Sequence, residues 1–164
     1  MFRKMRRASQ SLSEEEILSI LKSNTSGTLA LLGDNGYPYA RPLSYAYSDG
    51  KLNFHSAVKG HKIDAVTACP KASFCIIDRD DVFHEGFTTH YSSIIAFGKI
   101  RIIEDEQEKR RTAEILSDHY NMPGGERRER VINKNWNAFC MLEMDVEHIS
   151  GKTALALKQE SSGK

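Results

Sequence analysis

The chain has 164 residues, of which 40% are hydrophobic and 27% are charged, and its formal net charge is +1. These values indicate one globular domain with its own core, exclude a disordered chain and give no bias toward nucleic acid. The sequence has no signal-peptide core, no apolar run near the roughly 20 residues of a membrane span, and three cysteines without a CxxC spacing. We therefore expect a cytoplasmic protein without nucleic-acid or membrane partners, disulfides or a zinc site.

The N-terminal part of the chain divides into an arm and a helix. Residues 1–12 are mostly basic and polar, and we interpret them as a basic N-terminal arm. Ser13 and Glu16 then form a capping-box pattern, in which each side chain satisfies a backbone N–H of the other. This pattern predicts a helix that begins after Ser13 and ends near residue 22.

The first hairpin carries a face of unusually small side chains. A turn at 34–36 joins a strand at 28–32 to a return strand at 39–47. The small residues of the return strand are Ala40, Pro42, Ser44 and Ala46. Such a face lets a flat ligand come close, or it fills the narrow interior of a barrel, and the residues alone leave both interpretations open. Pro42 has no N–H to donate, which predicts a sheet edge or a bulge at this point.

Residues 52–77 have a layout that suits a phosphate group. An apolar strand ends in His55-Ser56-Ala57, a basic turn follows at 58–62, and a short helix at 63–68 leads to a second strand at 72–77. Hydroxyl and backbone N–H groups, a helix N-terminus and a lysine can converge on an anion in such a turn. The alternative is an ordinary solvated surface turn.

The second half of the chain predicts two more strands and two helices. We expect an irregular polar loop at 78–86, a strand at 88–103 with a bulge or a barrel corner at Gly98, helices at 105–121 and 126–133, and a last strand at 138–149. In that last strand, Glu143, Asp145 and Glu147 alternate with apolar residues and should face solvent. Residues 153–164 are polar and should form a loosely held tail. The elements together predict an α+β fold, mainly β, with six or seven antiparallel strands and peripheral helices.

Three residues in the polar loop invite a metal-site interpretation. They are His84, Glu85 and His90. Their spacing is not HExxH, and the residues between them suit a loop rather than a helix, so helical metal ligation fails. We predict a surface loop and no metal site.

Four segments in this order resemble the FMN-binding split β-barrel superfamily. They are RPLSYAY (41–47), LNFHSAVKGHKIDAV (52–66), CPKASFCI (69–76) and YSSIIAFGKIRII (91–103). The most similar branch is the one related to pyridoxamine 5'-phosphate oxidase that contains the nitroimidazole-resistance proteins. The resemblance covers residues 13–152 and implies a split β-barrel domain there. It also implies a homodimer with a flavin at the subunit interface.

The resemblance also implies roles for individual residues around the flavin. Lys62 matches the lysine of the phosphate-binding turn, and His61 stands where oxidases of the superfamily often carry arginine. The remaining implied contacts are His55, Ser56 and Ala57 beside the ribityl chain and ring, Pro42, Leu43 and Ser44 against the ring, Tyr91, Ser92 and Ser93 closing the site, and Trp136 reaching toward the neighbouring subunit's flavin.

The function that follows from the resemblance is an FMN-dependent oxidoreductase, with FAD as an alternative cofactor. It would reduce a small planar acceptor such as a nitroimidazole-type compound, with His55 as the candidate catalytic residue. The alternative for His55 is a hydrogen-bonded core histidine. Because fold does not fix function, the alternative for the protein is a non-catalytic flavin or haem binding or storage protein.

Overall fold

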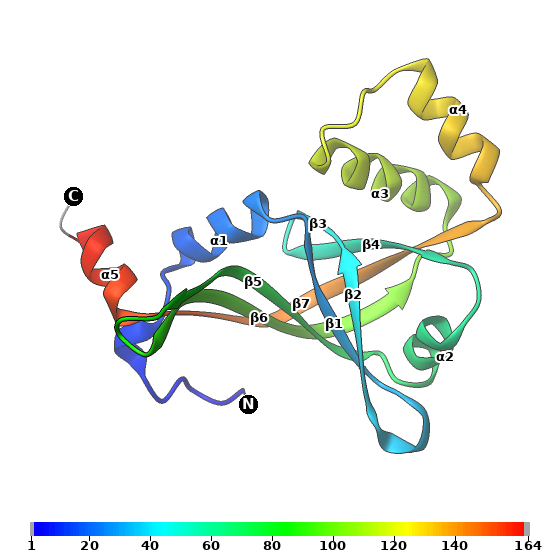
Figure 1. Cartoon of the computed structure of the whole chain (residues 1–164). Helices are drawn as coiled ribbons and strands as arrows, with labels where there is room; N and C mark the ends of the chain where they lie inside the picture. The colour runs from blue at the N-terminus through cyan, green and yellow to red at the C-terminus, as the bar shows by residue number, and fades with distance from the viewer. Residues whose placement is uncertain (1, 163–164) are drawn as a thin grey trace.

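The computed structural model describes residues 2–162, and one antiparallel sheet forms its centre. Within these residues, seven strands pair in the order β2-β1-β5-β6-β7-β4-β3. The strands are β1 (Ser26–Leu32), β2 (Pro38–Ser44), β3 (Ala46–Ser48), β4 (Lys51–Ala57), β5 (Lys71–Phe83), β6 (Thr88–Ile102) and β7 (Phe139–Thr153). β2 and β3 are neighbours in the chain but form opposite edges, so the sheet curls without closing (Figure 1). The predicted α+β split barrel is confirmed.

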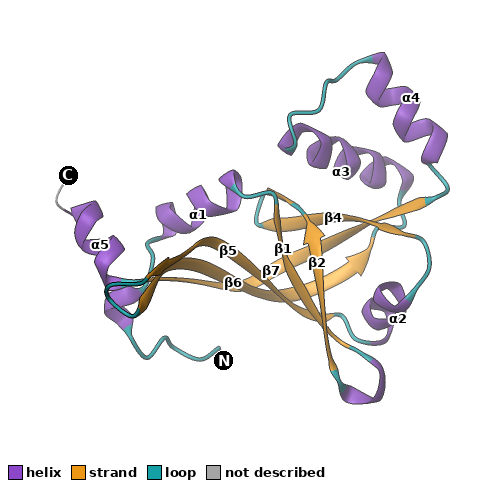
Figure 2. Ribbon diagram, in the orientation of Figure 1, coloured by secondary structure: helices purple, strands orange, loops and turns teal. Residues whose placement is uncertain are grey.

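The helices lie around this sheet (Figure 2). They are α1 (Glu14–Ser23), α2 (His61–Ala68), α3 (Glu106–His119), α4 (Glu126–Asn135) and α5 (Leu155–Ser162). The predicted capping box opens α1, because Ser13 Oγ accepts a hydrogen bond from the Glu16 N–H at 3.2 Å and the Glu16 carboxylate accepts one from the Ser13 N–H at 2.6 Å. α3 and α4 stand together beside one end of the sheet, and α5 lies at the other end.

Two apolar clusters hold the fold together. The larger lies inside the curled sheet and includes Leu29, Phe54 and Phe74, which are fully buried. The smaller joins α3 and α4 to the outer face of the sheet through residues such as Leu116 and Met141. α3 therefore covers the outer face where β4 ends and β7 begins.

The predicted return strand at 39–47 is wrong in one respect, because it is two strands. β2 ends at Ser44 and pairs with β1, whereas β3 begins at Ala46 and pairs with β4. Tyr45 between them is fully buried, and its hydroxyl donates to the Leu21 carbonyl at 2.9 Å. The chain turns a corner at this anchored ring, and the prediction that β2 is an edge strand at Pro42 is confirmed.

The predicted irregular loop at 78–86 is also wrong, because most of it is strand. β5 runs to Phe83 and stays paired with β6 as far as Thr88, with a register shift between Ile77 and Arg79. Both faces of this part are exposed, so the sequence shows no apolar alternation there. The bulge predicted at Gly98 is confirmed, since a side chain at that position would collide with the Asp145 carbonyl oxygen.

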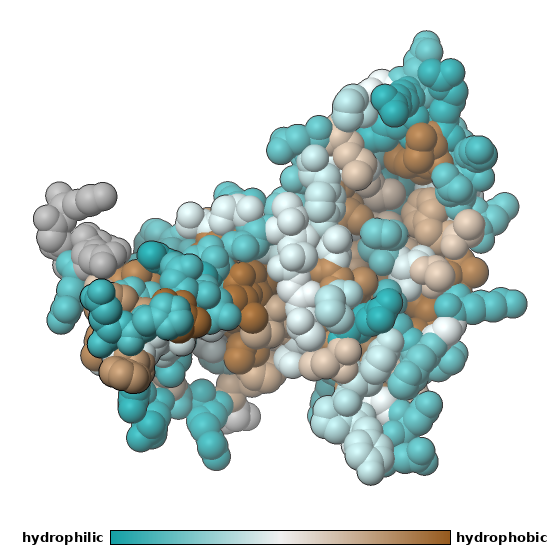
Figure 3. Space-filling model, viewed as in Figure 1, coloured by the Kyte–Doolittle hydropathy of each residue, from teal (hydrophilic) through white to brown (hydrophobic). Residues whose placement is uncertain are grey.

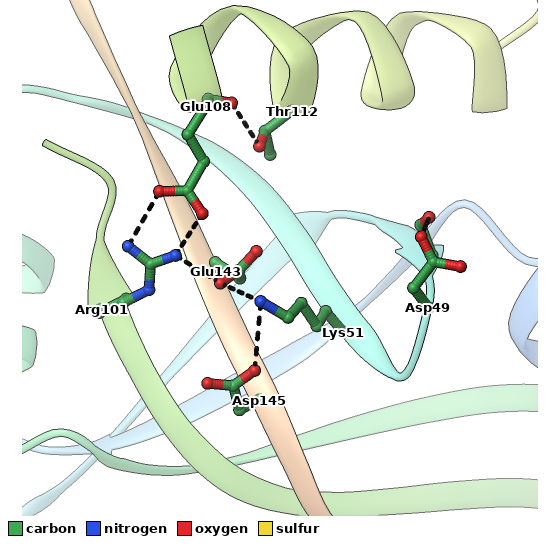
Figure 4. Close-up of polar contacts among 8 residues, drawn as sticks. Asp49, Lys51, Arg101, Glu108, Thr112, Glu143 and Asp145 are labelled. Atoms are coloured by element: carbon green, nitrogen blue, oxygen red, sulfur yellow. Dashed lines mark hydrogen bonds and ion pairs between the residues drawn. The ribbon is translucent and has the colours of Figure 1, made fainter. Parts of the chain in front are cut away.

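The prediction that Glu143 faces solvent is wrong. Only 2% of Glu143 is exposed, and its carboxylate accepts hydrogen bonds from Lys51 at 2.8 Å and Arg101 at 2.7 Å (Figure 4). Arg101 also pairs with Glu108 of α3. The alternation of residues in β7 placed Glu143 on the correct face of the strand. The side chain is nevertheless buried, because α3 covers that face at this point. Asp145, farther from α3, is exposed as predicted.

The two ends of the chain are more ordered than the sequence suggested. β7 continues to Thr153, and α5 follows with Leu157 buried, so the segment expected to be a loose tail contains a packed helix. The arm folds back along β7. Ser11 forms a bridge to Lys152, and the ring of Phe2 stacks on His148 at 4.7 Å between centroids.

Candidate functional site

The turn between β4 and α2 positions the predicted phosphate-binding residues. Gly60 has φ of 122°, a conformation that side chains disfavour, and it caps the start of α2. The N–H groups of Ile63 and Asp64 donate to the Gly60 carbonyl, which starts the helix at His61. The first-turn N–H groups of a helix and its dipole favour an anion at this end.

Lys62 is half-buried on the first turn of α2. Burial lowers the pKa of its ammonium group, the nearby Cys140 thiol opposes this, and the charge of Arg41 adds to the lowering. No ion pair involves Lys62 among residues 2–162. A desolvated cation without an internal counter-charge is a group to which an external anion can bind.

His55 lies at the end of β4 and opens onto a pocket of about 200 Å³. Burial and then the charge of Lys62 lower the pKa of its imidazole, so the ring is neutral at neutral pH. The pocket is also lined by Ser44 of β2 and by Leu116, Ser117, Tyr120 and Met122 of α3 and the turn after it. The core-histidine alternative does not describe this side chain, because it is exposed to the pocket.

Ser56 points to the opposite side of β4 from His55 and is buried. It pairs in register with Cys140 of β7. The Cys140 thiol donates to the Ala57 carbonyl at 3.5 Å. Burial raises the pKa of the thiol, against the opposing charges of Lys62 and Lys109, so it is protonated at neutral pH.

The small-residue face of β2 is turned outward. Ala40 and Pro42 are exposed and Ser44 is half-buried, whereas Leu43 on the other face packs against the large core cluster. The interpretation that small residues fill the barrel interior is therefore wrong for β2. A flat molecule can approach this backbone from outside.

His61 is turned away from Lys62, toward the first hairpin. Its ring stacks on Tyr39 at 4.1 Å between centroids, and its Nε2 lies 3.6 Å from an Asp34 carboxylate oxygen. These contacts place it at the margin of the turn. Among the residues predicted to bind the phosphate, His61 has the most clearly defined contacts within its own chain.

The structure does not bring Tyr91, Ser92 and Ser93 together with Lys62 in one chain. Ser93 pairs with Lys152 near one end of β7, and Ser56 pairs with Cys140 near the other end. Twelve residues of strand separate these two positions, which corresponds to about 40 Å. The two ends lie on opposite sides of the molecule in Figure 1.

Trp136 lies between α3 and α4 in a cage of charged side chains. Its Nε1 donates to Glu106 at 2.6 Å, and the ammonium group of Lys109 lies 4.2 Å from a ring centroid. The ring also packs edge-on against Phe139, which follows it into β7. These contacts account for Trp136 within one chain without a flavin.

Two residues near Lys62 were missed by sequence reasoning. Arg41 is exposed on the edge strand, and Cys140 is buried beside Ser56. Arg41 stands directly before Pro42 in a segment already singled out, so its charge was a usable signal. Cys140 gave no such signal, because in the sequence it is one of the apolar residues in a strand of alternating apolar and polar residues.

An open antiparallel sheet with a cationic strand–turn–helix at one end defines a split-barrel protein. The family model described as pyridoxamine 5'-phosphate oxidase matches residues 13–153, and the chain belongs to this family. The resemblance to the FMN-binding split-barrel superfamily is thus confirmed. No sequence among the curated proteins matches the chain.

Three solved structures show the similarity in more detail. A candidate 5-nitroimidazole antibiotic resistance protein from Bacteroides thetaiotaomicron is 20% identical, with 87% of this chain and 85% of that chain covered and a TM-score of 0.75. An FAD-binding protein from Mesorhizobium loti is 26% identical, with 88% and 97% covered and a TM-score of 0.63. An FAD and haem binding protein from Mycobacterium smegmatis is 20% identical, with 95% and 80% covered and a TM-score of 0.69.

The described part of the chain lacks two kinds of feature. No helix between residues 2 and 162 combines the length and the apolar character of a membrane span. Over the same residues, no group of three or more His, Cys, Asp or Glu side chains is arranged to hold a metal ion.

Proposed function

We propose that the protein is a flavin-dependent oxidoreductase that binds FMN and reduces small planar acceptors such as nitroimidazole-type compounds. The observation that carries the proposal is Lys62, a half-buried cation on the first turn of α2 with no ion-pair partner in residues 2–162. Next to it, His55 opens onto a pocket, and β2 presents a face of small side chains.

The residues present fit a flavin phosphate and ring. Lys62 and the N-terminal turn of α2 supply charge and N–H donors for a phosphate dianion, and Arg41 adds positive charge. The exposed backbone of β2 at Pro42 and Ser44 offers a surface against which a planar ring can lie. These features support FMN, and the FAD-binding protein at 26% identity keeps FAD as the alternative cofactor.

A bound flavin supplies the redox chemistry, accepting electrons from a reductant and passing them to the acceptor. The chain's own residues bind and orient. His55 is neutral at neutral pH and can accept or donate a hydrogen bond within the pocket it lines, and Leu116 and Tyr120 form part of the pocket wall. The pocket selects a small ligand by its size.

The proposed protein is a homodimer with a flavin at the subunit interface. The support is geometric, because the two groups of flavin residues implied by the resemblance lie about 40 Å apart along β7 in one chain. A flavin is much shorter than this, so Lys62 and Tyr91 contact the same molecule only if they come from different subunits.

The second candidate function is a non-catalytic flavin or haem binding or storage protein. It is favoured by the similarity to an FAD and haem binding protein from Mycobacterium smegmatis, over 95% of this chain. The pocket beside His55 would then hold part of the ligand without turnover.

One experiment separates the two functions. The visible spectrum of the purified protein, with the released ligand identified by mass, shows whether a flavin or a haem is bound. Steady-state oxidation of NAD(P)H with a nitroimidazole as acceptor then tests for turnover. A bound flavin with turnover supports the reductase, and tight binding without turnover supports the storage protein. If the protein binds neither flavin nor haem, both proposed functions are contradicted.

A further inference from the structure

A second pocket lies next to the one that His55 lines, which we call the His55 pocket. We call the second one the helix pocket, and its volume is about 310 Å³. Its walls come from the end of α3, the turn after α3 and the first two turns of α4, and its apolar members include Pro123, Val131 and Ile132. Figure 3 shows apolar side chains at the surface of this helix pair, among hydrophilic ones.

The position of α4 against α3 fixes the walls of the helix pocket. Arg110 of α3 pairs with Glu129 of α4 at 2.9 Å, and Arg128 of α4 pairs with Asp118 of α3. Ile132 is buried in the smaller apolar cluster, whereas 56% of Val131 stays exposed. The fold therefore holds this pocket open and leaves part of its apolar wall uncovered.

The helix pocket and the His55 pocket share two lining residues, Ser117 and Met122. Ser117 is fixed, because its hydroxyl donates to the Ala113 carbonyl at 2.8 Å. Met122 is 54% exposed, and no hydrogen bond holds its thioether within residues 2–162. A methionine side chain is unbranched and has three rotatable bonds, so it can turn aside without movement of the backbone. Met122 is thus a movable wall between the two pockets.

The volumes favour a joined site. The His55 pocket has a volume of about 200 Å³, which is below the roughly 300–1,000 Å³ of most small-molecule sites. With Met122 turned aside, the two pockets form one elongated site within that range. One end of the elongated site is lined by His55, and the other end is lined by two arginines of α4.

These arginines give the helix pocket a positive charge. Arg127 is exposed and forms no ion pair within residues 2–162. Arg128 donates to Asp118 through one terminal nitrogen, but its Nε is buried and has no hydrogen-bond partner among the described residues. A buried donor without an acceptor costs free energy, which an acceptor on a ligand recovers. An apolar wall beside an unpaired guanidinium and an unsatisfied N–H fits a ligand with an apolar part and an anionic end.

We propose that the acceptor site continues past Met122 into the helix pocket and takes planar acceptors whose apolar arm ends in a carboxylate. This inference rests on the proposed function for the role of the His55 pocket. The planar ring occupies the His55 pocket, the arm lies against Val131, and the carboxylate binds Arg127 and the Nε of Arg128. Met122 is then a specificity-determining residue, because it encloses a small acceptor in the His55 pocket and turns aside for a long one.

A series of 5-nitroimidazoles tests the proposal in the full-length protein with flavin added. Each compound carries on a ring nitrogen an arm of two to six methylene groups that ends in a carboxylate or, as the matched neutral compound, in a primary amide. We expect the carboxylate to bind about tenfold more tightly than the amide once the arm is long enough to pass Met122, as for a hydrogen bond to a charged group. The shortest arms should show no such preference. Isothermal titration without a reductant measures binding independently of turnover.

Three variants and one control locate the arm. Arg127→Gln should reduce the preference for the carboxylate severalfold and leave the affinity for the amide unchanged. Arg130→Gln is the matched control, since Arg130 is exposed on the same helix but does not line the pocket. Val131→Trp fills the helix pocket, so it should weaken binding of both long-armed compounds but not of 1-methyl-5-nitroimidazole. Met122→Ala removes the movable wall and should strengthen binding of the long-armed carboxylate only. Circular dichroism checks the fold of each variant.

The outcomes distinguish this inference from the proposed function. If the carboxylate has no advantage at any arm length, or if Arg127→Gln keeps the advantage, the inference is overturned, while reduction of 1-methyl-5-nitroimidazole still supports the proposed function. A carboxylate preference that Arg127→Gln and Val131→Trp remove, in a protein that reduces none of these compounds, supports the helix pocket as the binding site of the arm and contradicts the reductase. Loss of bound FAD from Val131→Trp overturns the inference as well, because the cofactor itself then occupies the helix pocket.

Discussion

Two groups of charged residues lie near the same end of the sheet. The buried charge of one group is paired within the chain, and that of the other is not. Glu143 is almost fully buried, and two cations, Lys51 and Arg101, neutralise it within hydrogen-bond distance (Figure 4). Lys62 is half-buried, and no carboxylate in the described residues neutralises it. Both side chains give up hydration, but only Glu143 is compensated inside its own chain.

This difference distinguishes a residue that stabilises the fold, Glu143, from a residue of the candidate binding site, Lys62. The carboxylate of Glu143 ties β4, β6 and β7 together, and through Arg101 and Glu108 it also fixes α3 against the sheet. An uncompensated cation such as Lys62 contributes nothing comparable to folding, so an external anion is the natural explanation for it. Variants at the two places should accordingly change different quantities.

The largest effect is expected at His55, in the uncompensated group. Replacing it by alanine should reduce turnover with a nitroimidazole acceptor by about a hundredfold, the scale of one well-placed proton donor or hydrogen-bond donor. Flavin affinity should change much less, because Lys62 and α2 hold the phosphate. Stopped-flow reoxidation and flavin titration measure the two quantities separately. If turnover and binding both stay intact, His55 takes no part in the reaction.

Arg101→Met should produce the largest loss of stability. The change removes one of the two cations from Glu143 and the link to Glu108, while a side chain of similar length remains. We expect a loss of about 2–3 kcal/mol in the free energy of unfolding, below the full cost of breaking a buried pair because Lys51 still reaches Glu143. Chemical denaturation followed by circular dichroism measures it.

The matched control for this variant is Lys99→Met, two residues earlier on the same face of β6. Lys99 pairs with Glu147 at 3.6 Å, and both side chains are largely exposed, so the change should cost well under about 1 kcal/mol. Equal losses at the two positions would show that the burial of Glu143 is energetically unimportant.

Lys62→Ala should weaken flavin binding without destabilising the fold. The expected loss is about 1.5–3 kcal/mol, or roughly ten- to a hundredfold in Kd, as for a hydrogen bond to a charged group. Lys59→Ala is the control, since Lys59 is exposed in the same turn and carries the same charge. Isothermal titration with FMN should separate the two variants, and equal affinities would place the phosphate elsewhere.

The features that the sequence could predict are those that depend on neighbouring residues, whereas features that depend on a distant element were missed. The capping box at Ser13, the bulge at Gly98 and the layout around His55 and Lys62 depend on local chemistry, and each appears where it was expected. The burial of Glu143 depends on α3, which is more than 20 residues away in sequence, so strand alternation alone could not reveal it.

The same limit applies to the segment 78–86 and to the predicted site residues Tyr91, Ser92 and Ser93. The end of β5 is exposed on both faces, so its sequence has no apolar alternation, and a polar loop was the natural prediction for 78–86. Tyr91, Ser92 and Ser93 were assigned by resemblance, and within one chain they lie about 40 Å from Ser56. Their role stays a prediction that depends on a second subunit.

The smallest effect is expected for the variant Glu143→Gln, whose loss of stability relative to the wild type should depend on pH. Burial by itself would raise the pKa of this carboxyl, but hydrogen bonds and charges from Lys51 and Arg101 outweigh burial and lower the pKa below its usual value. A carboxyl with a lowered pKa in the folded state contributes stability above its unfolded pKa, about 4.3, and loses it as the pH falls through the folded pKa. Glu143→Gln should therefore be less stable than the wild type at pH 7, by about 1 kcal/mol. The gap should begin to narrow below about pH 4, because the wild-type carboxyl is also neutralised as the pH falls through its lowered folded pKa. Parallel urea denaturation curves at both pH values measure the gap, and a gap that stays constant would mean that Glu143 is not ionised in the folded protein.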